Sequence, residues 1–367
     1  MKKIVVILFV ILFSTCQTTK MEESKSNIFY VGTYTNGESE GIYKYRMDDK
    51  GMLSKIGLVA KTNNPSFLAK TKDSKTLLAV EETDENGTGF VKSFQIQKDT
   101  LLFVSKSKSG GAHPCFITVN DNNDVLVANY TGGNVGFLKV DNQNGLTNLL
   151  ALQQHTGKGT TSRQEEPHAH STWFHPNNKE IISVDLGTNE LWLSQVKETQ
   201  NEYSFTGPTT LKMKEGAGPR HLTFHPNNKF IYVLNELDNT ISLVKQKEGN
   251  YTIESTISML PKGYTDYTKG ADIHITNDGK FLYASNRGHN SIVIYSVAEE
   301  TGKLSLVGFE SVRGGNPRNF SLSTDNKFLL VANQDTNNII SFKRNTTSGK
   351  LTFVNEISAP NPVCILF

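Results

Sequence analysis

The residues best suited to chemistry lie in short stretches of similar sequence. Arg220 follows a Gly-Pro pair, and Glu236 comes just after the apolar run that follows it in the chain. Arg287 ends a comparable apolar run, and His170 ends the stretch His168-Ala169-His170. Arginine binds carboxylate or phosphate groups through paired donors, whereas glutamate or histidine can take a proton from water or a substrate. If these side chains converge, they form a site for proton transfer on an anionic substrate.

Segments of this kind recur along the chain. Asn64-Pro65-Ser66-Phe67-Leu68, Gly218-Pro219-Arg220-His221-Leu222 and Asn316-Pro317-Arg318-Asn319-Phe320 each precede a turn and an apolar run. The residue just before that run falls at Lys75, Asp124, Lys179, Lys229, Lys280 and Lys327, so the repeats are 47 to 55 residues apart. A period of about fifty residues, made of short strands and turns, is typical of the blades of a β-propeller.

The two ends of the chain look like the halves of one further blade. Each full repeat predicts a short inner strand, a strongly apolar second strand, a third strand and a more variable outer strand. Residues 28–47 resemble the second and third strands alone, and residues 361–367 resemble a first strand alone. Joining them closes the ring and removes its open edge. We therefore predict an all-β fold, a seven-bladed β-propeller closed by N-terminal and C-terminal strands that share one blade.

This architecture predicts where the reactive side chains meet. The innermost strand of each blade lines the central channel, and a turn at residues 227 and 228 places Arg220 opposite residue 235. Arg220 and Glu236 should therefore emerge at the same mouth of the channel, and the same reasoning adds His170 and Arg287. The other residues predicted at this rim are Tyr34, Ser66, Glu82, Cys115, Tyr130, Leu186, Arg318 and Gln334.

Some of these residues also have interpretations other than catalysis. Arg220 and Glu236 can form an ion pair that only joins strands. His168 and His170 can bind a metal, because alternate residues of a strand share a face. No acidic or cysteine ligand set accompanies the two histidines, so the sequence favours a site without a metal or another cofactor.

Charge and motifs exclude several classes of function. The 367 residues include 38 basic and 36 acidic side chains, so no basic surplus points to nucleic acid or to an anionic membrane as a partner. No zinc-finger, P-loop or heptad pattern is present. Cys115 and Cys364 begin blades that should not be neighbours, which predicts two small buried side chains rather than a disulfide.

The N-terminus has the pattern of an export signal. Lys2 and Lys3 precede an apolar run at residues 4–13, which is too short to span a membrane. Cys16 follows, as at the lipidation site of a bacterial lipoprotein; the alternative is an ordinary cleaved signal with an incidental cysteine. We predict a signal peptide at 1–16, a polar tether at 17–27 and one propeller domain at 28–367. The protein is expected to be a monomer, exported to the periplasm or cell surface and held at the membrane only by this lipid.

Three motifs resemble those of a known family. They are Phe29-Tyr30-Val31-Gly32-Thr33-Tyr34-Thr35, Gly216-Ala217-Gly218-Pro219-Arg220-His221-Leu222 with Leu234-Asn235-Glu236-Leu237, and Ala271-Asp272-Ile273-His274-Ile275-Thr276 with Ser285-Asn286-Arg287. In them the chain resembles the lactonase-type seven-bladed propellers, which include bacterial 6-phosphogluconolactonases and fungal carboxymuconate cycloisomerases. The resemblance covers residues 28–367.

The resemblance implies metal-independent chemistry on a small lactone that carries anionic groups. The site of the cycloisomerase members uses a His, an Arg, a Glu and a second Arg, which fall on His170, Arg220, Glu236 and Arg287. For a lactonase it implies attack of water on the ring carbonyl, with Glu236 or His170 as the base and the two arginines stabilising the oxyanion. Weaker candidates for substrate contact at this mouth are His113, Tyr130, His274, Arg318 and Glu82.

Two other functions remain open on the sequence. The ring can be a non-catalytic binding or scaffold module at the cell surface, or a cycloisomerase acting on an unsaturated diacid. A scaffold has no need for His170, Arg220, Glu236 and Arg287 at one mouth, which favours an enzyme. The 6-phosphogluconolactonase pathway is cytosolic, so the predicted export points to another sugar-acid lactone as an alternative substrate.

Overall fold

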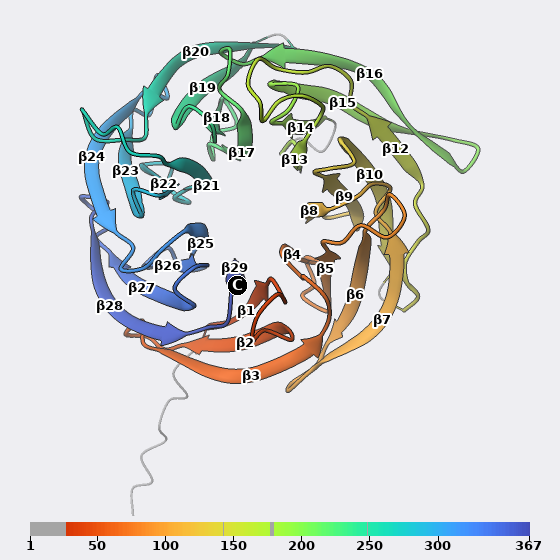
Figure 1. Ribbon diagram of the computed structural model, residues 1–367, viewed down its shortest axis with the longest axis horizontal. Helices are drawn as coiled ribbons and strands as arrows, with labels where there is room; N and C mark the ends of the chain where they lie inside the picture. Colours follow the sequence, from red (N-terminus) through yellow and green to blue (C-terminus); the bar gives the residue numbers. More distant parts are fainter. Residues whose placement is uncertain (1–26, 142, 177–179, 248) are drawn as a thin grey trace, which may run out of the picture.

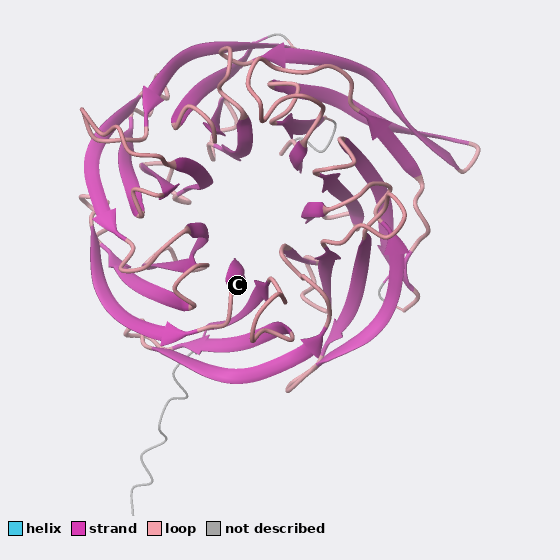
Figure 2. Cartoon of the chain, viewed as in Figure 1, coloured by secondary structure: helices cyan, strands magenta, loops and turns pink. Residues whose placement is uncertain are grey.

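The computed structural model describes residues 27–141, 143–176, 180–247 and 249–367. These residues form strands and turns, with no helix among them, and the strands are grouped into seven sheets around a central axis (Figures 1 and 2). No helix capable of crossing a membrane occurs in this part of the chain. Residues 1–26, which include the predicted signal and Cys16, lie outside it.

Six of the seven blades follow chain order from the axis outward (Figure 1). Blade 1 contains β4 (Leu68–Lys70), β5 (Thr76–Glu81), β6 (Phe90–Ile96) and β7 (Leu101–Lys108); blade 2 contains β8 (Pro114–Val119), β9 (Asp124–Asn129), β10 (Asn134–Asp141) and an outer edge divided between β11 (Gly145–Leu146) and β12 (Ala151–Gln154); blade 3 contains β13 (Ala169–Phe174), β14 (Ile181–Asp185), β15 (Glu190–Thr199) and β16 (Glu202–Lys212).

The next three blades repeat this order. Blade 4 contains β17 (Pro219–Phe224), β18 (Phe230–Asn235), β19 (Thr240–Lys247) and β20 (Asn250–Ser258); blade 5 contains β21 (Lys269–Ile275), β22 (Phe281–Arg287), β23 (Ser291–Val297) and β24 (Leu304–Ser311); blade 6 contains β25 (Pro317–Leu322), β26 (Phe328–Asn333), β27 (Asn338–Arg344) and β28 (Leu351–Ser358).

Blade 7 joins the two ends of the chain, as predicted. Its strand order is β29 (Pro362–Leu366), β1 (Asn27–Thr33), β2 (Gly41–Met47) and β3 (Leu53–Lys61). β29 pairs antiparallel with β1, so that Val31 lies opposite Ile365. A side chain at Gly32 would place its Cβ 2.3 Å from the Pro65 carbonyl oxygen of the next blade. Only glycine allows β1 to approach blade 1 this closely.

The apolar second strands form because both of their faces are covered. β18 (FIYVLN) and β26 (FLLVAN) are buried at every residue, and their aliphatic and aromatic side chains suit a strand enclosed on two sides. The turns that precede them place Asn228 and Asn326 at positive φ, 57° and 56°, a conformation that asparagine tolerates better than most residues.

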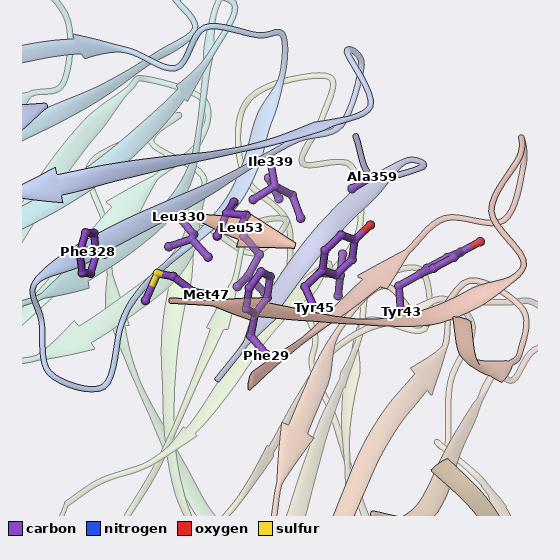
Figure 3. Close-up of a cluster of buried hydrophobic side chains, with 12 residues drawn as sticks. Phe29, Tyr43, Tyr45, Met47, Leu53, Phe328, Leu330, Ile339 and Ala359 are labelled. Carbon is purple, nitrogen blue, oxygen red and sulfur yellow. The ribbon is translucent and has the colours of Figure 1, made fainter. Parts of the chain in front are cut away.

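The core lies between adjacent sheets. Figure 3 shows the cluster between blades 7 and 6, where Phe29 and Tyr45 face Leu330 and Ile339. The rings of Phe29 and Tyr45 stack with their centroids 5.5 Å apart. Comparable clusters join the other blades, for example blades 4 and 5 through Tyr232. Each blade therefore obtains its core from its neighbours, and the ring must close to complete it.

We predict that the C-terminal strand is an essential part of this core. Ile365 is 5% exposed within the blade 7 cluster, so Ile365→Ala should lower the free energy of unfolding by about 2–5 kcal/mol. The matched control is Leu306→Ala on the outer strand β24, where the side chain is 53% exposed and the expected change is within about 0.5 kcal/mol. Chemical denaturation measures both, and equal losses would show that β29 is not integrated into the ring.

Candidate active site

Four of the predicted rim residues lie at irregularities that recur in the inner strands. The register of β17 shifts between Pro219 and His221, and that of β13 between Ala169 and Ser171. β25 shifts between Pro317 and Asn319 in the same way, and β8 between Pro114 and Phe116. Such a β-bulge leaves one residue without a partner and changes the direction of its side chain. The bulged residues are Arg220, His170, Arg318 and Cys115.

Glu236 is the centre of the cluster at this mouth. It follows β18, and its backbone NH donates to the Gly218 carbonyl at 2.7 Å. Its side chain is 3% exposed, and Oε2 lies 3.1 Å from Nε of Arg220 and 2.8 Å from Nη2 of Arg287. Glu236, Arg220 and Arg287 therefore converge at one mouth, as the sequence predicted. Arg287 comes from blade 5, so the cluster also joins two blades.

The two arginines are themselves held by backbone oxygens. Arg287 Nη2 donates to the Gly270 carbonyl at 2.7 Å, and Arg220 Nη1 donates to the Ala271 carbonyl. Burial lowers the pKa of Arg220 to about 10, with help from the charge of Arg287. Burial opposes the ionisation of Glu236, but the charges of Arg287 and Arg220 outweigh it and lower the pKa of the carboxyl to about 2. At neutral pH the cluster is therefore a carboxylate between two guanidinium groups.

A second network positions Arg318. Its Nη2 donates to the Tyr34 hydroxyl at 2.8 Å, and that hydroxyl donates to Oε2 of Glu82 at 2.9 Å. The Ser66 hydroxyl donates to the same carboxylate oxygen. Burial raises the pKa of Tyr34, so the phenol remains protonated. The structure thus brings Glu82 and Arg318 to the rim as predicted, with Tyr34 as the link between them.

His170 is buried beside the arginines in its neutral form. Burial lowers the pKa of its imidazole well below 6.5, and the charge of Arg220 lowers it further. Its Nδ1 lies 3.8 Å from Sγ of Cys115, whose own thiol pKa is raised by burial. The ring meets those of Tyr130 and His221 edge-on, with centroids 5.4 and 5.5 Å apart. His170 is therefore a neutral proton acceptor, and Cys115 is a thiol rather than a nucleophilic thiolate.

A buried carboxylate network extends from Arg220 along the inner strands. The Nδ1 of His221 lies 2.8 Å from Oδ1 of Asp272, and Nε2 of His274 lies 3.1 Å from Oδ2. Asn319 also donates to Asp272, at 2.6 Å. Burial and the charge of Arg220 lower the pKa of His221 to about 4. For His274, burial also favours a lower pKa, but the negative charge of Asp272 outweighs it and raises the pKa. His274 is 35% exposed, but it contacts Asp272 rather than Glu236.

Sequence reasoning missed His221 and Asp272 as members of this network. Both lie within the motifs that carried the family resemblance, so the signal was present. Their contact joins residues 51 apart in neighbouring blades, which a register argument within one hairpin does not reach.

Tyr130 belongs to the mouth, but through a partner that the sequence did not indicate. Its hydroxyl accepts from Nη2 of Arg163 at 2.9 Å, and the same nitrogen lies 3.6 Å from Oε1 of Glu236. The Tyr130 ring stacks on His168 with the centroids 4.4 Å apart. Arg163 was missed because it lies in the 155–168 loop, outside the repeat. His113, in contrast, pairs with Thr131 at 2.9 Å, and no interaction among the described residues links its side chain to the arginine cluster.

The two histidines of His168-Ala169-His170 have separate partners. His168 Nδ1 lies 3.1 Å from the Tyr130 carbonyl oxygen, whereas His170 faces Cys115. In the described part of the chain, no group of three or more His, Cys, Asp and Glu side chains is arranged to hold a metal ion. The side chains at the mouth instead combine a neutral imidazole with a positive field.

The mouth carries more positive than negative charge. Arg163, Arg220, Arg287 and Arg318 lie around the two carboxylates of Glu82 and Glu236, which leaves two positive charges in excess. Asp272, which pairs with His221 and His274, reduces this excess by one charge but does not reverse it. The arrangement can bind an anionic molecule and stabilise negative charge that develops on an oxygen.

Comparison with known proteins agrees with this architecture. A family model described as "Lactonase, 7-bladed beta-propeller" matches residues 28–367. The 6-phosphogluconolactonase of Bacillus subtilis is 37% identical over 347 residues, which are 93% of this chain and 98% of that protein.

Solved structures show the same ring. A putative 6-phosphogluconolactonase from Bacteroides fragilis has a TM-score of 0.87 and 32% identity, and the match covers 93% of this chain and 97% of that one. The periplasmic gluconolactonase of Pseudomonas aeruginosa has a TM-score of 0.88 and 28% identity, and here the match covers 93% and 98%. The seven closed blades, the cluster around Glu236 and these matches lead to one conclusion: the chain belongs to the seven-bladed β-propeller lactonase family.

Proposed function

We propose that the protein is a lactonase that hydrolyses the ester of a sugar-acid lactone carrying a further anionic group, with 6-phosphogluconolactone as the model substrate. The observation that carries this proposal is the excess of positive charge around Glu236, next to a neutral histidine. The names of the relatives, 6-phosphogluconolactonase and gluconolactonase, support the same class of substrate. A scaffold protein would gain no stability from clustering these cations around Glu236, because each charge that is buried costs desolvation energy.

His170 is the better candidate for the general base. A base works best when its pKa lies near the pH of the reaction, and the two arginines hold the pKa of Glu236 at about 2. The pKa of His170 is also low, because of burial and the charge of Arg220. A bound anion offsets that charge and raises the pKa of His170 toward neutrality. Glu236 then keeps Arg220 and Arg287 in place.

Three groups on this chain act in the reaction, and Glu236 holds two of them in place. His170 takes a proton from water as its oxygen attacks the carbonyl carbon of the lactone. The carbonyl oxygen becomes an oxyanion, which Arg220 and Arg287 stabilise. Collapse of the tetrahedral intermediate breaks the ring C–O bond, and the imidazolium returns the proton to the leaving alkoxide. The product is the open-chain acid, whose carboxylate remains in the field of the arginines. No step in this sequence needs a metal ion.

We also propose that the mature protein acts outside the cytoplasm, attached to the membrane through a lipid on Cys16. The charged, apolar and cysteine segments of residues 1–16 support this, and so does the likeness to a periplasmic gluconolactonase. A substrate met there is a lactone outside the cell, and the ring is proposed to act on it as a monomer.

The guanidinium of Arg220 can be tested by a substitution that keeps its charge. Arg220→Lys keeps the positive charge beside Glu236 but removes the guanidinium fork, so kcat should fall by about 100-fold with the fold intact. Proton release from 6-phosphogluconolactone, gluconolactone and a muconolactone measures turnover, with and without a chelator. The control is Arg313→Lys, an exposed arginine that packs on Phe353 of the outer strand β28.

The outcomes of this assay separate the candidate functions. Turnover that survives the chelator and falls only in Arg220→Lys supports the proposed chemistry. Loss of turnover in the chelator would contradict a metal-independent reaction. A folded wild-type protein without turnover on any of the three lactones would point to a binding propeller, and activity on muconolactone alone would favour a cycloisomerase.

The pH profile tests the role of His170. Because burial and Arg220 lower its pKa below 6.5, the base is already deprotonated near neutrality. We expect kcat/KM for gluconolactone to be flat from about pH 6 to about pH 8 after the spontaneous rate is subtracted, and His170→Asn to remove most of it. Gluconolactone carries no phosphate, so its charge is constant in this range. An inflection near pH 6.5 in the wild type would contradict a buried neutral base.

The membrane anchor has a direct test. Cys16→Ser should move the protein from the membrane fraction to the soluble fraction of cells and abolish incorporation of a labelled fatty acid. Cys364→Ser is the matched control, because Cys364 is buried in blade 7 and is inaccessible to a lipid transferase. A wild-type protein that is already soluble and unlabelled would mean that the segment is an ordinary cleaved signal.

A further inference from the structure

Arg163 differs from the other arginines at the mouth. Arg220 and Arg287 are buried against Glu236 and backbone carbonyl groups, and Arg318 is held by Tyr34. The side chain of Arg163 is 42% exposed. Among the described residues, its guanidinium donates one hydrogen bond, from Nη2 to the Tyr130 hydroxyl at 2.9 Å. Its guanidinium is therefore partly open to solvent beside Glu236.

The loop that carries Arg163 is anchored firmly at both ends. It spans residues 155–168, between β12 and β13. At its start, Nδ1 of His155 lies 2.7 Å from Oδ2 of Asp185, with both side chains fully buried. At its end, the His168 NH donates to the other oxygen of the same carboxylate at 2.9 Å. One buried carboxylate thus ties the two ends of the loop to blade 3.

The residue next to Arg163 fixes the middle of the loop. Gln164 is fully buried, and its Nε2 donates to the Leu186 carbonyl at 2.8 Å and to Oδ1 of Asn189 at 3.1 Å. A Cβ on Gly187 would lie 1.9 Å from the Glu166 carbonyl oxygen, so the loop packs directly on the blade 3 backbone. Arg163 is therefore presented from a rigid support, and little conformational entropy is lost when it binds a ligand.

The charge of Arg163 is not balanced by a partner of its own. The nearest carboxylate oxygen, Oε1 of Glu236, lies 3.6 Å away, and that carboxylate already pairs with Arg220 and Arg287. Tyr130, which accepts its hydrogen bond, is neutral because burial raises the pKa of the phenol. A partly exposed guanidinium that shares its counter-ion with two other arginines matches the oxygen atoms of a phosphate or carboxylate.

We propose that Arg163 is a substrate-specificity residue. It binds the anionic group of the lactone that does not react, and a phosphate monoester fits it best. Arg220 and Arg287 stabilise the oxygen of the ring carbonyl. This inference rests on the proposed lactonase function and assigns a residue to the anionic group of its substrate. It predicts that the enzyme distinguishes a phosphorylated lactone from its unphosphorylated counterpart through a loop that lies outside the blade repeat.

A competing location for the anion lies beside Arg287. A pocket of about 290 Å³ is lined there by Tyr267, Lys269 and Arg287, among others. Lys269 Nζ lies 5.4 Å from the centre of the Tyr267 ring. Lys269→Ala removes one of the two cations that line this pocket and leaves Arg163 in place, so this variant is tested alongside.

The kinetic test compares two lactones that differ by one phosphate. For Arg163→Ala we expect the ratio of kcat/KM for 6-phosphogluconolactone to that for gluconolactone to fall by about 10- to 100-fold, mainly through KM. Arg163→Lys should recover part of the loss. Lys158→Ala, an exposed cation on the same loop, is the matched control and should keep the wild-type ratio.

Binding of the reaction products provides a readout without turnover. Calorimetry should show that Arg163→Ala weakens the binding of 6-phosphogluconate by the same factor and leaves the affinity for gluconate unchanged. An unchanged ratio and unchanged binding in Arg163→Ala would overturn the inference, as would a selective loss in Lys269→Ala alone. If the wild type turns over no lactone but binds 6-phosphogluconate through Arg163, the lactonase proposal fails and the anion subsite stands.

Discussion

The structure depends on the burial of both faces of the apolar second strands. A sheet whose second strand is apolar on each side cannot be stable alone, so every blade requires two neighbours. Seven such sheets satisfy this condition only when the ring is closed, and the pairing of β29 with β1 closes it. The inner strands of all the blades then surround one axis, and residues far apart in the chain become neighbours.

The closed ring also makes the charged mouth possible. The Glu236 carboxylate is buried between Arg220 of its own blade and Arg287 of the next, and the arginines contact backbone carbonyl groups of blade 5. Desolvation of these ions is unfavourable, and the apolar contacts between blades must outweigh that cost. Concentrated cations with few counter-ions are a departure from the most stable arrangement, of the kind that proteins tolerate at functional sites.

The inner-strand bulges connect the fold with the chemistry. In a regular strand the residue after Pro219 would pair with its neighbour and its side chain would follow the alternation of the sheet. The bulge frees Arg220 from this pattern, and the same irregularity recurs at Cys115, His170 and Arg318. A single structural device repeated around the ring can therefore present different functional groups to one ligand, with the chemistry set by the residue type at each bulge.

The repeat period, the seventh blade shared by the termini and the meeting of Arg220, Glu236 and Arg287 were all predictable from the order of residues. These conclusions need only the alternation of turns and apolar runs and the register of a hairpin, which are local properties of the chain. The remaining contacts and the protonation states depend on how the blades pack together. Arg163 reaches Glu236 from a loop without periodicity, and His221 meets Asp272 across two blades. The protonation states of His170 and Glu236 follow from burial and from the summed field of several arginines, because desolvation and charge act through space and not along the chain.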